Sequence, residues 1–243
     1  MRVKVTLSYD GSAFNGLQKQ PLDADVKTVA GTLEEALNRL HIDSTPVASG
    51  RTDTGVHALA QVVHFDVPEP WNDLAKLRHY LNRSLMPHSY VKKIEPVDEC
   101  FNARFDAQKR LYRYIMYEGV YQPFFSAYAL HVSSLDVAKL DTLAKLFEGK
   151  HAFGFFKKTG GGTTGEERTI FKAGAYRYQK KIILYFLGDA FLRSQIRMMT
   201  DMLLKVESGS LSPEDLIAQR DKRKKISSTL APACGLYLSR IYY

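Results

Sequence analysis

Segments of strand periodicity alternate with segments of helical periodicity along this chain. Residues 2–9 alternate apolar and polar side chains, beginning with Val3 and Val5, which is typical of a strand with one buried face. After Thr28, a suitable N-cap, apolar residues recur at helical spacing. The order strand, helix, strand returns later in the chain. We therefore expect an α+β protein without regular parallel crossovers.

The same patterns predict the other elements and a division into two halves. Further strands are expected at residues 61–67, 90–97, 109–117, 169–178, 180–187 and 235–241, and further helices at residues 72–81, 137–147 (after Ser134), 191–207 and from 212 onward. A glycine-rich loop covers residues 157–168. We expect similar α/β halves at residues 1–105 and 106–243, each with an antiparallel sheet, and a ligand cleft between them.

Composition favours a polyanionic partner. The chain has 34 Lys and Arg residues against 26 Asp and Glu, a formal charge of +8, so RNA or DNA fits better than an acidic small molecule, although charge alone locates no groove. No apolar run approaches the length of a membrane span and no signal peptide is evident, so we expect a cytoplasmic protein without a membrane partner. Cys100 and Cys234 show no metal-binding or disulfide spacing, so no metal site is expected.

One turn presents a candidate catalytic carboxylate. Residues 50–58 read GRTDTGVHA, which sets Asp53 between Gly50 and Gly55 with Arg51 close by. Glycines permit sharp bends, so such a loop can bring its main chain against a ligand. In the alternative interpretation, Asp53 caps its own turn and Arg51 is merely solvated. The turn alone does not decide between the two.

Two other interpretations of this turn are less favoured. Asp-Thr-Gly also occurs in aspartic proteases, whose chemistry needs two carboxylates sharing a proton, but only one such tripeptide is present here. His57 stands near the required carboxylate, where a histidine adds little obvious chemistry. We expect His57 to be a hydrogen-bonded turn residue and not a catalyst.

Residues 50–58 resemble the signature of the tRNA pseudouridine synthase A (TruA) family. Further blocks resemble family motifs in the family's order: Tyr9-Asp10-Gly11-Ser12 with Gly16 and Gln18, Phe101-Asn102-Ala103-Arg104-Phe105, Tyr112-Arg113-Tyr114, Phe191-Leu192 with Arg197, and Ala231-Pro232-Ala233 with Gly235-Leu236-Tyr237-Leu238. The resemblance implies the pseudouridine synthase fold, in which two similar halves with antiparallel sheets flank a central active-site cleft.

The resemblance also implies a reaction and its residues. Family members isomerise uridines at positions 38–40 of the tRNA anticodon stem-loop to pseudouridine, as homodimers, without metal, organic cofactor or guide RNA. Asp53 matches the essential aspartate, Tyr112 the tyrosine that contacts the target base, and Arg197 the arginine that pairs with the aspartate. Arg51 resembles the residue associated with extruding the target nucleotide.

Basic residues elsewhere are candidates for further RNA contacts. Arg110 shares a strand face with Tyr112, and Lys222 and Arg223 belong to a basic run that also includes Arg220. Such side chains can follow RNA phosphates, although a solvated helix end explains the run nearly as well. We expect Arg110, Lys222 and Arg223 to contribute to RNA binding.

The chemistry gives reasons for these residue types. Isomerisation cuts a C–N glycosidic bond, turns the detached uracil and rejoins it through carbon. Asp53 can attack C1′ or C6, or can remove the C2′ proton to give a glycal, which is the route favoured by the family resemblance. Arg197 would favour the charged carboxylate, and Tyr112 can stack on the flipped base and assist removal of the C5 proton. An inactive RNA-binding protein or tRNA chaperone is the alternative.

Some positions depart from the family's usual residues. Leu17 replaces a tryptophan, Asp189 replaces an asparagine, Gln195 and Ile196 replace Met-Val before Arg197, and Thr200 stands near a common glycine. We expect these changes to affect helix packing and substrate preference more than the type of reaction.

Overall fold

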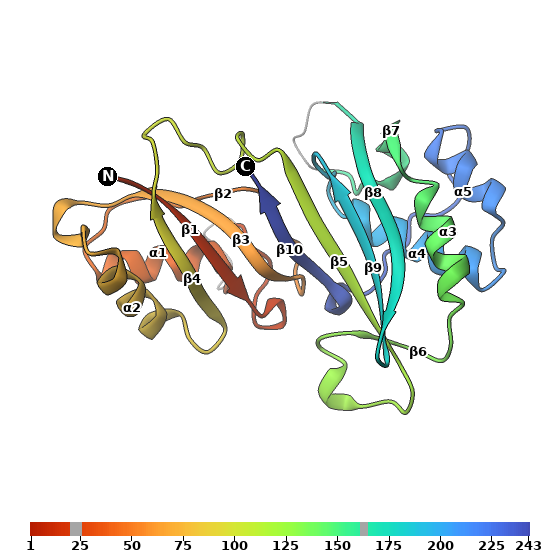
Figure 1. The fold of residues 1–243 in the computed structure, drawn as a ribbon, viewed down its shortest axis with the longest axis horizontal. Coiled ribbons are helices and arrows are strands. Elements are labelled where there is room, and N and C mark those ends of the chain that lie inside the picture. The colour runs from red at the N-terminus through yellow and green to blue at the C-terminus, as the bar shows by residue number, and fades with distance from the viewer. Residues whose placement is uncertain (20–25, 161–164) are drawn as a thin grey trace. The chain divides into compact units, whose positions relative to one another are not determined.

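The computed structural model describes residues 1–19, 26–160 and 165–243, and these form two compact units (Figure 1). The first unit comprises Met1–Gln108 with Leu238–Tyr243, and the second comprises Lys109–Tyr237. The C-terminal segment groups with the first unit because Gln108 N–H donates to the Tyr242 carbonyl at 2.8 Å and the Tyr243 hydroxyl donates to the Ala103 carbonyl at 2.8 Å. The sequence patterns predict a different division, in which this segment belongs to the half that begins at residue 106.

The first unit is built on antiparallel strands. These are β4 (Ser89–Pro96), β1 (Arg2–Tyr9) and β3 (His57–Asp66) in spatial order, with the short β2 (Val47–Ala48) beside β3. Every second residue of β1 is buried, beginning with Val3, which confirms the predicted one-sided strand. Two helices, α1 (Val29–Arg39) and α2 (Leu74–Leu85), contact each other, and α2 packs against β4.

The caps set where these helices begin. Thr28 Oγ1 accepts the Gly31 N–H at 3.1 Å, so α1 starts where the sequence predicted. At α2, Asp73 Oδ1 accepts the N–H groups of Ala75 and Lys76, so this helix starts at Leu74 and not at residue 72. Leucines recur on the buried faces of both helices.

The second unit repeats the combination of a sheet with helices. Strands β5 (Lys109–Glu118), β9 (Lys181–Gly188), β8 (Glu167–Tyr178) and β7 (Gly149–Ala152) are antiparallel in this spatial order. Helix α3 (Val137–Lys145) packs against β8, and α4 (Gln195–Glu207) contacts both α3 and α5 (Pro213–Arg220). The final strand, β10 (Leu236–Tyr242), includes residues of both units.

One strand contradicts the expected all-antiparallel arrangement. Strand β6 (Leu130–Val132) pairs in parallel with β5, with Leu130 beside Met116. Residues 119–129 form a connection long enough to return the chain and start β6 in the same direction as β5. The fold is therefore α+β with mixed strand directions.

One helix of the second unit starts as predicted and another does not. Helix α3 begins at Val137, as expected, and Asp136 caps it, because its Oδ1 accepts the Lys139 N–H at 3.0 Å. Helix α4 begins at Gln195 instead of residue 191, because Ser194 has a left-handed φ of 59° that interrupts helical geometry. In the described ranges, no helix is long and apolar enough to cross a membrane.

Candidate active site

Asp53 lies on a tight loop between β2 and β3. The Val56 N–H donates to the Asp53 carbonyl at 3.1 Å, and Gly55 within this turn has a φ of 78°. Asp53 is partly buried, while Arg51 on the same loop is exposed. The loop thus leaves Asp53 partly accessible, with the exposed Arg51 two residues before it in the chain.

The end of β1 and the segment that follows it hold this loop in place. The Tyr9 hydroxyl and Thr52 Oγ1 are 2.8 Å apart, and the Leu17 N–H donates to the Thr52 carbonyl at 3.2 Å. Leu17 is buried. The blocks around residues 9–18 and 50–58, which the family resemblance singled out separately, therefore form one structure.

Gly11 allows the closest of these contacts. A Cβ at Gly11 would lie 2.2 Å from the Val56 carbonyl oxygen, which belongs to the backbone of the Asp53 loop. Any larger residue would force the two segments apart. The position of the Asp53 loop thus depends on a glycine at residue 11.

His57 and Gln61 secure the loop from β3. His57 is 2% exposed, and its Nδ1 accepts the Gly11 N–H at 3.0 Å, so in this hydrogen bond Nδ1 carries no proton. Gln61 is fully buried; its Oε1 accepts the Ser49 hydroxyl at 2.6 Å and its Nε2 donates to the Gly50 carbonyl at 3.0 Å. Sequence reasoning missed Gln61, whose only signal is an amide within an apolar strand.

Tyr112 lies in β5 of the second unit and is fixed against Phe191. The two ring centroids are 5.3 Å apart with the planes at 82°, an edge-to-face contact. Tyr112, Tyr114 and Met116 are all buried. The blocks of residues 112–114 and 191–192 therefore meet within this unit.

Arg197 lies in α4 and is tied to the segment that precedes β10. Its Nε donates to the Ala231 carbonyl at 2.7 Å, and the Ala231 N–H donates to the Arg197 carbonyl at 3.1 Å. The Tyr114 hydroxyl donates to the adjacent Pro232 carbonyl at 2.8 Å. Burial raises the pKa of Tyr114, which keeps this hydroxyl protonated as a donor. The second unit thus links the strand of Tyr112 to Arg197 through residues 231–232.

Two departures from the family pattern shape the turn that carries Phe191. Asp189 Oδ1 accepts the Thr169 N–H at 3.1 Å and the Ala190 N–H at 2.5 Å. Buried Gln195 turns back, and its Oε1 accepts the Leu192 N–H at 2.7 Å. Both substituted residues therefore serve as backbone acceptors.

The other predicted RNA contacts have partners within the protein. Arg110 Nη1 donates to the Asp189 carbonyl at 2.5 Å. Lys222 Nζ lies 2.7 Å from Glu166 Oε2, and Arg223 Nη2 lies 3.6 Å from Asp221 Oδ2. Lys222 and Arg223 follow α5 and are exposed, so they form a basic surface of the second unit.

The His, Cys, Asp and Glu side chains form no cluster suited to a metal ion in the part of the chain that the structure describes. Across residues 1–19, 26–160 and 165–243, no group of three or more His, Cys, Asp or Glu residues is arranged to hold a metal ion. Cys100 and Cys234 are free thiols.

Comparison with known proteins identifies the class of protein that carries Asp53 in its first unit and Tyr112 and Arg197 in its second. The family described as tRNA pseudouridine synthase matches residues 6–106 and 143–243, which include Asp53 and Arg197. The chain is 42% identical to tRNA pseudouridine synthase A of Helicobacter pylori strain 26695, over 99% of this chain and 98% of that protein. It is 40% identical to tRNA pseudouridine synthase A of Campylobacter jejuni subsp. doylei over the full length of both. The chain belongs to the tRNA pseudouridine synthase family, as its resemblance to TruA predicted.

Proposed function

We propose that this protein is an isomerase that converts uridines at positions 38–40 of the tRNA anticodon stem-loop to pseudouridine. Family membership and relatives named tRNA pseudouridine synthase A support a tRNA substrate. The structural observation that carries the proposal is the Asp53 loop, since hydrogen bonds with Tyr9, Leu17 and Gln61 fix Gly50 and Thr52 of this loop. A loop held in this way helps to preorganise the carboxylate that it carries.

We propose Asp53 as the base of a glycal route. Asp53 removes the C2′ proton as the N1–C1′ bond breaks, and the uracil leaves with the bonding electrons. The uracil turns, its C5 bonds to C1′, and C2′ regains a proton. The proton lost from C5 is balanced by the proton gained at N1, so nothing is oxidised or reduced. The chemistry therefore requires no redox cofactor, and the family resemblance implies that the reaction also proceeds without metal, organic cofactor or guide RNA.

Tyr112, Arg197 and the basic residues complete the proposed site. The Tyr112 ring, fixed by Phe191, is suited to stack on a flipped uracil, and its hydroxyl assists removal of the C5 proton. Arg197 is assigned to keep the Asp53 carboxylate charged. Arg51 assists extrusion of the nucleotide, and Arg110, Lys222 and Arg223 contact RNA. We propose that the protein works as a homodimer, with the tRNA spanning both subunits.

The Asp53→Asn variant tests this proposal. We expect it to lower pseudouridine formation on purified tRNA by about 10³-fold or more, because the amide cannot act as a base, while tRNA affinity stays close to that of the native protein. Chemical mapping of pseudouridine without added cofactor measures the product. Asp43→Asn, which removes an exposed carboxylate from the same unit, is the matched control and retains activity.

Two outcomes count against the proposal. Full activity of Asp53→Asn would show that this carboxylate is not the base. If the native protein binds tRNA but forms no pseudouridine on any tRNA, the chain is an inactive RNA-binding protein or tRNA chaperone.

A further inference from the structure

The carboxylate of Glu166 is held between two lysine ammonium groups in the second unit. Lys157 Nζ lies 2.6 Å from Oε1, and Lys222 Nζ lies 2.7 Å from Oε2. The side chains of Lys157, Glu166 and Lys222 are 35%, 31% and 39% exposed, so solvent and ligands reach all three. Each oxygen of one anionic group therefore has its own cation at the protein surface.

The backbone of Glu166 is positioned without help from this ion pair. The Phe153 N–H donates to the Glu166 carbonyl at 2.9 Å. The carboxylate itself packs against Gly154, where an added Cβ would lie 2.2 Å from Oε2. Lys222 Nζ also lies 5.9 Å from the centre of the Phe155 ring, a cation–π contact. A change at the carboxylate should thus leave the fold and the position of Lys222 largely intact.

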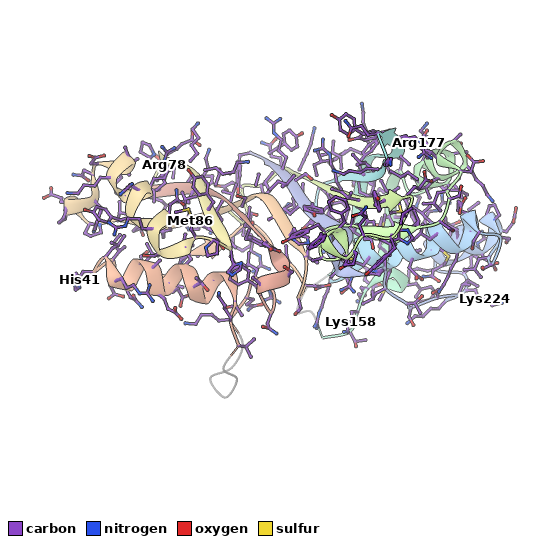
Figure 2. The ribbon with its side chains drawn as sticks, turned by 90° about the horizontal axis from the view of Figure 1, so that it is seen from below. His41, Arg78, Met86, Lys158, Arg177 and Lys224 are labelled. Carbon is purple, nitrogen blue, oxygen red and sulfur yellow. The ribbon has the colours of Figure 1, made fainter. Side chains whose placement is uncertain are left out.

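Further cations adjoin Lys157 and Lys222 in the sequence. Lys158 is next to Lys157 in the chain, and three cations follow Lys222 directly: Arg223, Lys224 and Lys225. All four are exposed, and Figure 2 shows Lys158 and Lys224 at the lower edge of this unit. The two ammonium groups hold the pKa of Glu166 at about 2, so the carboxylate remains charged at neutral pH.

We propose that Lys157 and Lys222 form a binding site for a backbone phosphodiester of the tRNA, and that Glu166 occupies this site as a competing internal anion. The inference rests on the proposed tRNA substrate but not on the catalytic role of Asp53. A phosphodiester, like a carboxylate, presents two anionic oxygens that two ammonium groups can share. Exposed ion pairs are weak, so an incoming phosphate can displace the Glu166 side chain and be held by the same lysines.

The variant Glu166→Gln tests the competition. Glutamine has a similar size but no charge, so both ammonium groups become available to RNA. We expect tRNA to bind about fivefold more tightly at roughly 0.1 M salt, and the plot of log affinity against log salt to steepen by about one, as an additional phosphate contact requires. Fluorescence anisotropy with labelled tRNA across a salt series measures both quantities.

A matched carboxylate in the first unit controls for net charge. Glu95 also lies between two lysines, with Lys93 Nζ at 2.6 Å and Lys4 Nζ at 3.6 Å. Glu95→Gln changes the protein's charge by the same amount on β4. We expect its effect on affinity to stay below about twofold, because a single charge away from the contact surface acts weakly through salt.

A second variant distinguishes the effect of moving the Glu166 carboxylate from the effect of removing its charge. Gly154→Ala keeps Glu166 ionised but places a methyl group where the carboxylate packs, so the carboxylate should move away from the lysines. We expect tighter tRNA binding in the same direction as for Glu166→Gln. Adding Lys222→Ala to Glu166→Gln should cancel most of the gain. Thermal melting of each variant identifies any that fail to fold.

Three results would overturn the inference: unchanged or weaker binding by folded Glu166→Gln, an equal gain in Glu95→Gln, or a gain that survives Lys222→Ala. Pseudouridine formation is assayed separately on the native protein. If tRNA is bound but not converted, the proposed function fails while the competition at Glu166 can still be measured. If tRNA is converted and Glu166→Gln binds no more tightly, only the inference fails.

Discussion

Thr200 illustrates how one residue can work against the stability of a helix. It lies in α4, one turn after Arg197, and is fully buried. Its hydroxyl is among the few buried side-chain groups in the described residues without a hydrogen-bond partner. The sequence singled out this position only because it stands near a common glycine of the family, since a missing hydrogen bond cannot be recognised before the neighbours are known.

Replacing Thr200 by valine should stabilise the protein. Valine keeps the shape of the side chain and removes the unsatisfied hydroxyl, so we expect the free energy of unfolding to rise by about 1 kcal/mol. Urea denaturation followed by circular dichroism measures the change. Thr200→Ser keeps the hydroxyl and loses a buried methyl group, so it should be less stable than the native protein. A less stable Thr200→Val would mean that the hydroxyl has a partner in solution.

At the scale of elements, long periodic segments were predictable and short ones were not. The alternating pattern located β1 and β5, and the capping residue Thr28 located the start of α1. Strands β2, β6 and β7 are too short for a period of two residues to be recognised. Asp73 caps α2, which therefore starts at Leu74 and not at residue 72, because several residues near a helix start can serve as the cap.

The contact between the turn after β1 and the Asp53 loop can be tested through Gly11→Ala. The added methyl group meets the Val56 backbone, which cannot rotate away as a side chain can, so the Asp53 loop must shift. A small displacement of a catalytic group is costly, and we expect kcat to fall about 10²-fold. Steady-state kinetics on tRNA, with melting temperature as a check of folding, measures the effect.

Ser12→Ala provides the control within the same turn. Its hydroxyl donates to Asp10 Oδ1 at the surface, and the change leaves the backbone contact with Val56 untouched. We expect kcat within about twofold of the native value, since exposed substitutions have small effects. Equal losses in both variants would indicate that the turn as a whole, and not the close approach at Gly11, supports activity.

At the scale of the whole molecule, the sequence offers candidate site residues more readily than the residues that support them. Asp53, Tyr112 and Arg197 were chosen because motifs resembled a known family; spacing alone left each open to a structural interpretation. The supports join residues distant in the chain, such as Tyr9 with Thr52 and Arg197 with Ala231. Periodicity describes neighbours within one element and therefore does not predict such pairs.

The pH dependence of stability is also a property of the whole molecule. As the pH falls from neutral, we expect the first loss of stability to come from His64. His64 is 5% exposed, and its Nδ1 accepts the Ala103 N–H at 3.0 Å. Burial, followed by the charge of Arg2, lowers the pKa of His64. A histidine with a lowered folded-state pKa stabilises the fold above the unfolded pKa of about 6.5, and this stabilisation is lost as the pH falls through the folded-state value.

Carboxylates that pair with cations cause a second loss of stability at lower pH. Hydrogen bonds from Arg2 lower the pKa of Asp66, and those from Lys157 and Lys222 lower the pKa of Glu166 to about 2. Their stabilisation is present above the unfolded pKa of about 4 and is lost as the pH falls through the lower folded-state values. The two groups therefore act in separate pH ranges.

His64→Gln should remove the loss of stability that His64 causes and leave the loss at lower pH that the paired carboxylates cause. The glutamine carbonyl can accept the Ala103 N–H in place of Nδ1 but takes up no proton, so the free energy of unfolding should change less between pH 7 and about 5 than in the native protein. Urea denaturation across this range measures the slope. His79→Gln, which removes an exposed histidine from α2, should keep the native slope. An unchanged slope in His64→Gln would assign the loss of stability above pH 5 to other groups, because a residue that cannot titrate contributes nothing to the proton uptake on unfolding.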